Sequence, residues 1–169
     1  MTTISMHDAT VKPCVRALTQ LAAILEKGQA YAEAKKIEPS VLVGARLFPD
    51  MLPLSVQVQI AADSAKGGAS RLAQATPPAF EDNEKTFPEL IERCRKTIAV
   101  LESLDAKAFV GSEDRTVTWK TRSGDRSMQG LPYLMHWVLP NVFFHVTTAY
   151  DILRHNGVEV GKRDFLGPA

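Results

Sequence analysis

Apolar residues recur at steps of three and four along most of the chain, which is the period of an amphipathic α-helix. The first helix is predicted from Asp8 to about Ala34, and its stripe consists of Val11, Val15, Leu18, Ala22 and Leu25. We expect Asp8 to cap this helix, because its carboxylate can accept hydrogen bonds from the free amides of the first turn.

A second helix is predicted from about Pro53 to Gln74, and its stripe is rich in small residues: Leu54, Val58, Ala61, Ala65 and Leu72. Small side chains let a neighbouring helix approach closely or leave space for a pocket, and close packing is the commoner outcome. The run Thr76-Pro77-Pro78 ends this helix and begins a polar loop.

A third helix begins at Thr86-Phe87-Pro88-Glu89, which has the pattern of a capping box. The stripe then runs to about Asp105 through Leu90, Cys94, Thr97 or Ile98, Leu101 and Leu104. Because Cys94 lies on this stripe, we interpret it as a buried and inert thiol.

The helical period stops between Phe109 and Gly130. Val117, Trp119 and Thr121 alternate with polar residues, and Ser123-Gly124-Asp125 is typical of a turn. We therefore predict a β-hairpin at about 115–128, lying against one end of a helical bundle with Trp119 as its packing anchor.

The last helix is predicted from Leu131 to His155, with Pro140 kinking or restarting it. Its stripe consists of Leu131, Met135, Val138, Val142, His145, Ala149 and Ile152. Gly157 is a suitable stop, and the tail at 161–167 is expected to dock on the body. Four amphipathic helices without strand–helix alternation predict an all-α four-helix bundle, as one domain over residues 1–169.

The composition narrows the function classes. The chain has 169 residues, 45% of them hydrophobic, and a net charge of +1, so we expect no nucleic-acid partner. No apolar run is long enough to span a bilayer, and no secretory signal is visible, so we expect no membrane association and a cytoplasmic location. The two cysteines are far apart, which argues against a disulfide framework.

The candidate chemistry centres on His145, which occupies a stripe position where an apolar residue is expected. A buried imidazole needs hydrogen-bond partners, so His145 is either a metal ligand or general base, or a structural histidine with satisfied nitrogens. Asn141 lies one turn earlier on the same face, and Gln57 leans inward from the second helix. Asp50 is the nearest carboxylate in sequence, and a helix-capping role is the alternative for it.

Several stretches resemble an uncharacterised bacterial branch of the DinB/YfiT-like superfamily. They are Pro49–Leu54 (PDMLPL), Gln57–Ala61 (QVQIA), Leu139–Tyr150 (LPNVFFHVTTAY), Ile152–Val158 (ILRHNGV) and Gly161–Gly167 (GKRDFLG). The resemblance spans nearly the whole chain and implies a four-helix bundle with a long crossover, commonly a homodimer.

Many members of that superfamily bind a divalent metal with three histidines, one on the second helix and an HxxxH pair on the fourth. By this resemblance His145 matches the second histidine of the pair, Asn141 stands in place of the first, and Gln57 replaces the second-helix histidine. Two of the three ligands are therefore absent.

Three functions follow from this resemblance. The first is a degenerate metal- or thiol-dependent transferase or hydrolase acting on a small molecule, with His145 as base or sole imidazole ligand and Gln57, Asn141 and Asp50 orienting the substrate. The second is a non-catalytic small-molecule-binding protein that has lost the metal site. The third is a structural dimer with a satisfied internal polar network.

Overall fold

The computed structural model describes residues 4–121 and 124–168. Four long helices make up most of it: α1 (Met6–Lys35), α3 (Leu54–Leu72), α4 (Phe87–Glu102) and α6 (Leu139–His155). The shorter elements are α2 (Pro39–Val43), η1 (Ala106–Phe109), β1 (Thr116–Thr121), β2 (Gly124–Gln129), α5 (Gly130–Tyr133), η2 (Leu134–Val138) and α7 (Lys162–Leu166).

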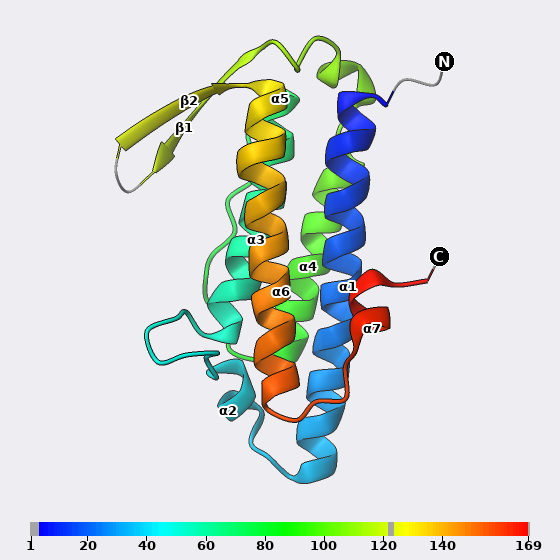
Figure 1. The fold of residues 1–169 in the computed structure, drawn as a ribbon, viewed down its shortest axis with the longest axis vertical. Helices are drawn as coiled ribbons and strands as arrows, with labels where there is room; N and C mark the ends of the chain where they lie inside the picture. Colours follow the sequence, from blue (N-terminus) through cyan, green and yellow to red (C-terminus); the bar gives the residue numbers. More distant parts are fainter. Residues whose placement is uncertain (1–3, 122–123, 169) are drawn as a thin grey trace.

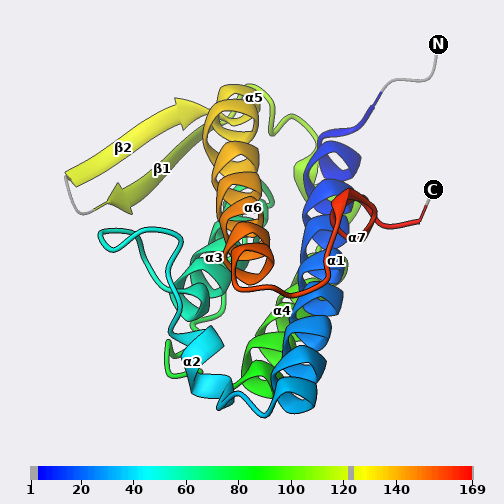
Figure 2. The same ribbon diagram turned by 60° about the horizontal axis from the view of Figure 1, so that its bottom comes forward.

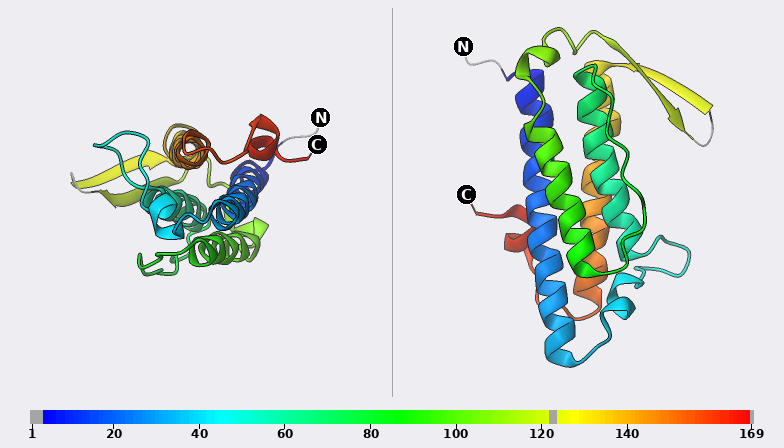
Figure 3. Two further views of the ribbon diagram at one scale, coloured as in Figure 1. Left: turned by 90° about the horizontal axis from the view of Figure 1, so that it is seen from below. Right: turned by 180° about the vertical axis from the view of Figure 1, so that it is seen from behind.

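The long helices form a four-helix bundle with a two-stranded hairpin at one end, as the sequence predicted (Figures 1 and 2). In the bundle α1 and α3 each pack against both α4 and α6. The segment at 73–86 runs back along the outside of the bundle from the end of α3 to the start of α4 (Figure 3). Because of this long crossover, α3 and α4 point the same way.

The core lies along the axis of the bundle, where the predicted stripes meet. The five stripe residues of α3 are fully buried: Leu54, Val58, Ala61, Ala65 and Leu72. Gly68 brings α3 close to the end of η2, because a Cβ built on it would lie 2.5 Å from Cγ1 of Val138. The small-residue stripe of α3 therefore serves close helix packing against this part of the chain.

The helix ends follow capping rules, with one correction. Thr86 and Glu89 form the predicted capping box at the start of α4. Asp8 does not cap α1, because the helix begins at Met6 and the side chain of Ser5 accepts from the amide of Asp8. Asp8 instead lies in the first turn, where its charge favours the helix dipole. After α6, Gly157 takes a φ of 92° and ends the helix as predicted.

The hairpin packs on the bundle through aromatic side chains. Strands β1 and β2 are antiparallel, with Val117 opposite Met128 and Trp119 opposite Arg126. Trp119 is buried, and its ring centroid lies 4.6 Å from that of Tyr133 and 5.1 Å from that of Trp137. Trp119 is thus the anchor that the sequence predicted, whereas Ser123 of the predicted turn lies outside the described residues.

The last helical segment contains a wide turn that the stripe did not predict. Residues Leu134–Val138 are π-helical, and α6 begins at Leu139 with Pro140 in its first turn. Pro140 has no amide hydrogen to donate to the preceding turn, and a wider turn accommodates it. The backbone stays helical through this junction, so the helix changes from π to α one residue before Pro140. Leu131 and Met135 are exposed rather than buried.

The C-terminal tail docks on α1 through short α7, as expected. Nε and one terminal nitrogen of Arg16 donate to the carbonyls of Leu166 (2.9 Å) and Pro168 (2.8 Å). Lys27 pairs with Asp164 at 2.6 Å. Among the residues described, no helix is both long and apolar enough to cross a membrane.

Candidate functional site

The seam between α3 and α6 brings His145 and Gln57 together. Gln57 is 2% exposed, in the first turn of α3, and its Oε1 lies 2.7 Å from Nδ1 of His145 on α6. The Nε2 amide of Gln57 donates to the carbonyl of Leu52 at 3.0 Å. One buried amide therefore connects the segment before α3 with the histidine on α6.

These two contacts determine which nitrogen of the imidazole ring carries the hydrogen. The carbonyl of Leu52 can only accept, so it must face the NH₂ group of Gln57, and Oε1 of Gln57 must face His145. An amide oxygen also only accepts, so Nδ1 of His145 carries the hydrogen. In the neutral ring Nε2 then holds the lone pair, and none of the residues described donates a hydrogen bond to it.

Burial keeps this imidazole neutral. His145 is half-buried, and loss of hydration lowers its pKa from the ordinary value of 6.5. Within residues 4–121 and 124–168 no carboxylate is hydrogen-bonded to the ring to counter this effect, and its partner at Nδ1 is an uncharged amide. His145 is therefore a neutral base and hydrogen-bond acceptor at neutral pH.

Asn141 lies one turn before His145 and has a structural bond of its own. Its Nδ2 donates to the carbonyl of Trp137 at 2.6 Å, at the junction between the π-helical turn and α6. This bond leaves Oδ1 of Asn141 as a second acceptor on the same side of α6. Asn141 and His145 therefore share a helix face, as their spacing predicted, although neither bonds the other.

Asp50 does not join this group. Its side chain is exposed, and no hydrogen bond links it to Gln57, Asn141 or His145. It does not cap α3 either, because the residue at that position is Pro53, which provides no side-chain bond. Neither the ligand-binding nor the capping interpretation of Asp50 gains support from its position.

The residues at the seam do not fit a three-histidine metal site. Gln57 uses both ends of its amide on Leu52 and His145, so it has no oxygen directed to a metal shared with His145. Amide oxygens are also weak ligands for the transition metals that imidazole binds. In the part of the chain that the structure describes, no three His, Cys, Asp or Glu residues cluster closely enough to hold a metal ion.

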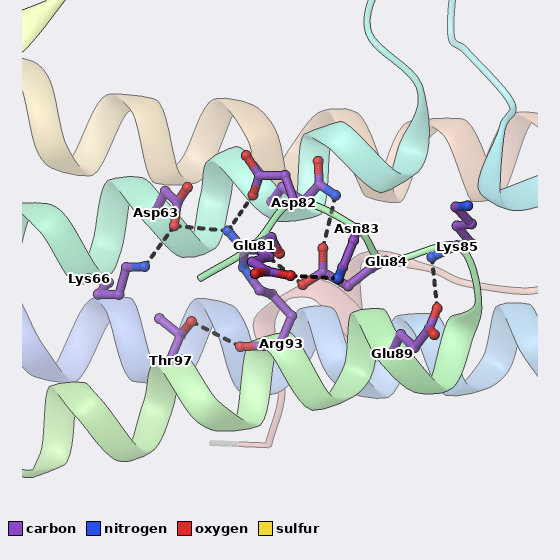
Figure 4. A network of polar contacts seen from close by, with 11 residues as sticks. Asp63, Lys66, Glu81, Asp82, Asn83, Glu84, Lys85, Glu89, Arg93 and Thr97 are labelled. Carbon is purple, nitrogen blue, oxygen red and sulfur yellow. Dashed lines mark hydrogen bonds and ion pairs between the residues drawn. The ribbon is translucent and has the colours of Figure 1, made fainter. Parts of the chain in front are cut away.

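A second polar cluster, which the sequence analysis missed, surrounds Arg93 on α4 (Figure 4). The guanidinium side chain is 1% exposed and pairs at 2.9 Å with each of three carboxylates: Asp63, Asp82 and Glu84. It also donates to the carbonyl of Glu81 at 3.0 Å. Lys66 extends the cluster from α3, with Nζ 3.0 Å from Asp63 and 3.8 Å from the ring centroid of Phe80.

This cluster ties the 73–86 crossover to the bundle. Asp82 and Glu84 come from the crossover, and Asp63 comes from α3. Hydrogen bonds from Arg93 and Gln59 lower the pKa of Glu84 despite the opposing effect of its burial. A signal was available in the sequence, because Arg93 lies three residues after Leu90 and four before Thr97, on the buried side of α4.

The buried cysteines carry no chemistry in this fold. Cys14 on α1 and Cys94 on α4 are both fully buried, and burial raises the pKa of each thiol to about 12. A thiol with such a pKa is a poor nucleophile at neutral pH. The prediction that Cys94 is inert agrees with this environment.

Comparisons with known proteins agree with the fold. A crystal structure of a DinB family member protein from Shewanella denitrificans shares 39% sequence identity, with a TM-score of 0.90. The match covers 97% of this chain and 93% of that one. Comparison with functionally curated proteins found no match.

A family model covers the same region. The model described as domain of unknown function DUF1993 matches residues 6–166, which include every long helix of the bundle as well as Gln57, Asn141 and His145. The chain therefore belongs to the DUF1993 family and has the fold of a DinB family protein.

Proposed function

We propose that the protein binds a small molecule at the seam between α3 and α6, and that it does so without a divalent metal. The observation that supports this most directly is the bond between Gln57 and His145. It holds the imidazole in one tautomer and leaves the lone pair of Nε2 available to a ligand.

The available atoms define the ligand class. Nε2 of His145 and Oδ1 of Asn141 both accept hydrogen bonds, and the bond from Nδ2 of Asn141 to the carbonyl of Trp137 fixes which end of that amide is the oxygen. A ligand with two N–H or O–H donors matches this pair, whereas an anion would face two lone pairs. Amides, alcohols and amines are therefore favoured over carboxylates and phosphates.

Metal content is the first test. Tag-free protein is purified after growth with nickel, zinc, manganese and iron, and its metal is measured by elemental mass spectrometry. We expect metal far below one ion per chain, because the donors at the seam form a poor transition-metal site. Near-stoichiometric metal that disappears in His145→Ala would contradict the proposal and restore a metalloenzyme function.

Ligand binding is tested by thermal shift with a panel of neutral amides, alcohols and amines. A ligand of the folded state raises the melting temperature. We expect hits whose shift disappears in His145→Phe and persists in His136→Phe, since His136 is exposed on η2, outside the seam. Binding is then followed by ring-nitrogen NMR of His145, in which Nε2 should respond more than Nδ1.

A second candidate is a transferase or hydrolase in which His145 acts as general base. The observation that favours it is the neutral ring with its Nδ1–H oriented by Gln57, which is the state required to accept a proton at Nε2. Turnover of any hit, with a rate that falls as His145 becomes protonated, would distinguish this enzyme from a binding protein.

A further inference from the structure

An apolar groove is lined by residues of α1, η2, α6 and α7. Figure 1 shows α1 and α6 next to each other, with α7 beside α1. Its volume is about 690 Å³, within the usual range for small-molecule sites. Large apolar side chains of its lining remain exposed: Ile4, Met135, Phe143 and Leu166. Exposed apolar surface concentrated in one groove is typical of a binding site.

This groove is separate from the seam that contains His145. Successive residues of an α-helix are about 100° apart, so Phe143 and His145 lie on opposite sides of α6. Phe143 lines the groove, whereas the ring of Phe144 packs edge-on against His145 with centroids 5.1 Å apart. A ligand in the groove would therefore leave the seam free.

The groove is long on both of its helical sides. Its α1 side extends from Asp8 to Ala17, and its other side, on η2 and α6, spans the eleven helical steps from Met135 to Val146. At 1.5 Å per residue, the wall on the α6 side is roughly 17 Å long. An extended chain advances about 1.2 Å per bond, so this length suits a hydrocarbon of roughly ten to fourteen carbons.

The charges on the α1 rim favour an anionic head group. Asp8 and Lys12 neutralise each other at 3.0 Å. Arg16, one turn further on, donates to two backbone carbonyls and forms no ion pair with any described carboxylate. Among the described residues this positive charge beside the apolar groove has no carboxylate partner, and guanidinium groups bind carboxylates well.

We propose that the groove between α1 and α6 binds a free fatty carboxylate, with the hydrocarbon chain along the groove and the carboxylate at Arg16. This inference goes beyond the proposed function at the seam and does not depend on it. Each buried methylene raises the affinity by about fourfold, so affinity increases with chain length up to the length of the groove.

The test is calorimetric titration of the full-length protein with decanoate below its micellar concentration. We expect saturable binding of one decanoate per chain. Decyltrimethylammonium has the same chain and the opposite charge, and it should bind at least about tenfold more weakly. Equal affinities for the two amphiphiles would overturn the role of Arg16.

The matched variants are Phe143→Asp and Phe144→Asp, which are adjacent on α6 and exposed before substitution. Phe143→Asp should weaken decanoate binding by at least about tenfold, because it places a negative charge inside the groove, and Phe144→Asp should change it less than about twofold. Equal effects of the two variants would overturn the proposal.

Analytical ultracentrifugation of the same proteins tests the competing occupant, which is a second copy of this chain. We expect wild type and Phe143→Asp to sediment with the same molecular mass. A dimer that dissociates in Phe143→Asp but not in Phe144→Asp would show that a second copy covers the groove, and would also overturn the proposal.

Discussion

Nδ1 of His145 donates to the amide oxygen of Gln57 across 2.7 Å, and this bond joins α6 to the first turn of α3. Gln57→Leu removes the acceptor and leaves a half-buried N–H without a partner. We expect the free energy of unfolding to fall by about 1–3 kcal/mol, measured by urea denaturation.

The double variant Gln57→Leu/His145→Leu is the control for this prediction. It removes both partners and fills the seam with apolar side chains. Its loss of unfolding free energy should therefore be smaller than the sum of the losses in Gln57→Leu and His145→Leu. Additive losses would mean that the bond contributes nothing to stability.

Protonation of His145 is expected to destabilise the fold. Its pKa is lower in the folded protein than the 6.5 of a solvated histidine, so between these two values the unfolded chain binds more protons and stability rises with pH. The contribution of the neutral ring is complete above about pH 6.5 and is lost as the pH falls through the lowered folded pKa.

This dependence is measured as the difference in unfolding free energy between wild type and His145→Leu, at about pH 7.5 and about pH 5. We expect the difference to shrink at the lower pH. His136→Leu, at an exposed position, should show no such change. A constant difference for His145→Leu would contradict burial of the neutral ring.

The sequence predicted the bundle because three of the four stripes follow one uninterrupted helical period. It failed at Leu131 and Met135, which are exposed, and the reason is the π-helical turn at 134–138. A π-turn advances through a smaller angle per residue, so the positions before it rotate relative to those after it. Tyr133 and Leu134 are buried instead.

The candidate site was predictable only in part. Spacing placed Gln57 on the inner face of α3 and His145 near the core stripe of α6, and the structure brings them into contact. Spacing could not show that Asp50 is exposed, because that depends on the path of an irregular connection. It also could not show that Asn141 bonds Trp137, since that carbonyl lies where the wide turn meets α6.

Gly68 and Gly67 are adjacent on α3 and should respond differently to alanine. In Gly68→Ala the new methyl would lie 2.5 Å from Val138, inside the contact between α3 and η2, and we expect a loss of about 1–3 kcal/mol. In Gly67→Ala it would meet only the end of the Arg71 side chain, which can move, and alanine also favours the helix. Thermal unfolding should show a lower melting temperature for Gly68→Ala alone.

Cys14 and Cys94 should resist thiol reagents while the protein is folded. Burial raises the pKa of both thiols to about 12, so little thiolate is present at neutral pH and the reagent has no access. We expect labelling by a disulfide reagent only at the rate of unfolding, and full labelling of both in denaturant. Rapid labelling of one thiol in native buffer would show that its helix opens locally.

Arg93 should be a main determinant of stability, because it is the buried cation that holds the crossover. Arg93→Met leaves the carboxylates of Asp63, Asp82 and Glu84 close together with Lys66 as the remaining cation of the cluster. Only Glu84 would be left as a nearly buried carboxylate, because Asp63 and Asp82 are 44% and 59% exposed and stay hydrated. Removing one partner from a fully buried ion pair costs about 3–5 kcal/mol, so we expect urea denaturation to show a smaller loss of about 2–3 kcal/mol here.

Arg95→Met is the matched control, two residues further along α4. Arg95 pairs with Glu26 at the same 2.9 Å distance, but both side chains are more than half exposed. Exposed ion pairs contribute about 0–1 kcal/mol, so this variant should be nearly as stable as wild type. If the two variants were equally stable, the carboxylates of the crossover would not depend on Arg93, and the 73–86 segment would be held by its apolar contacts alone.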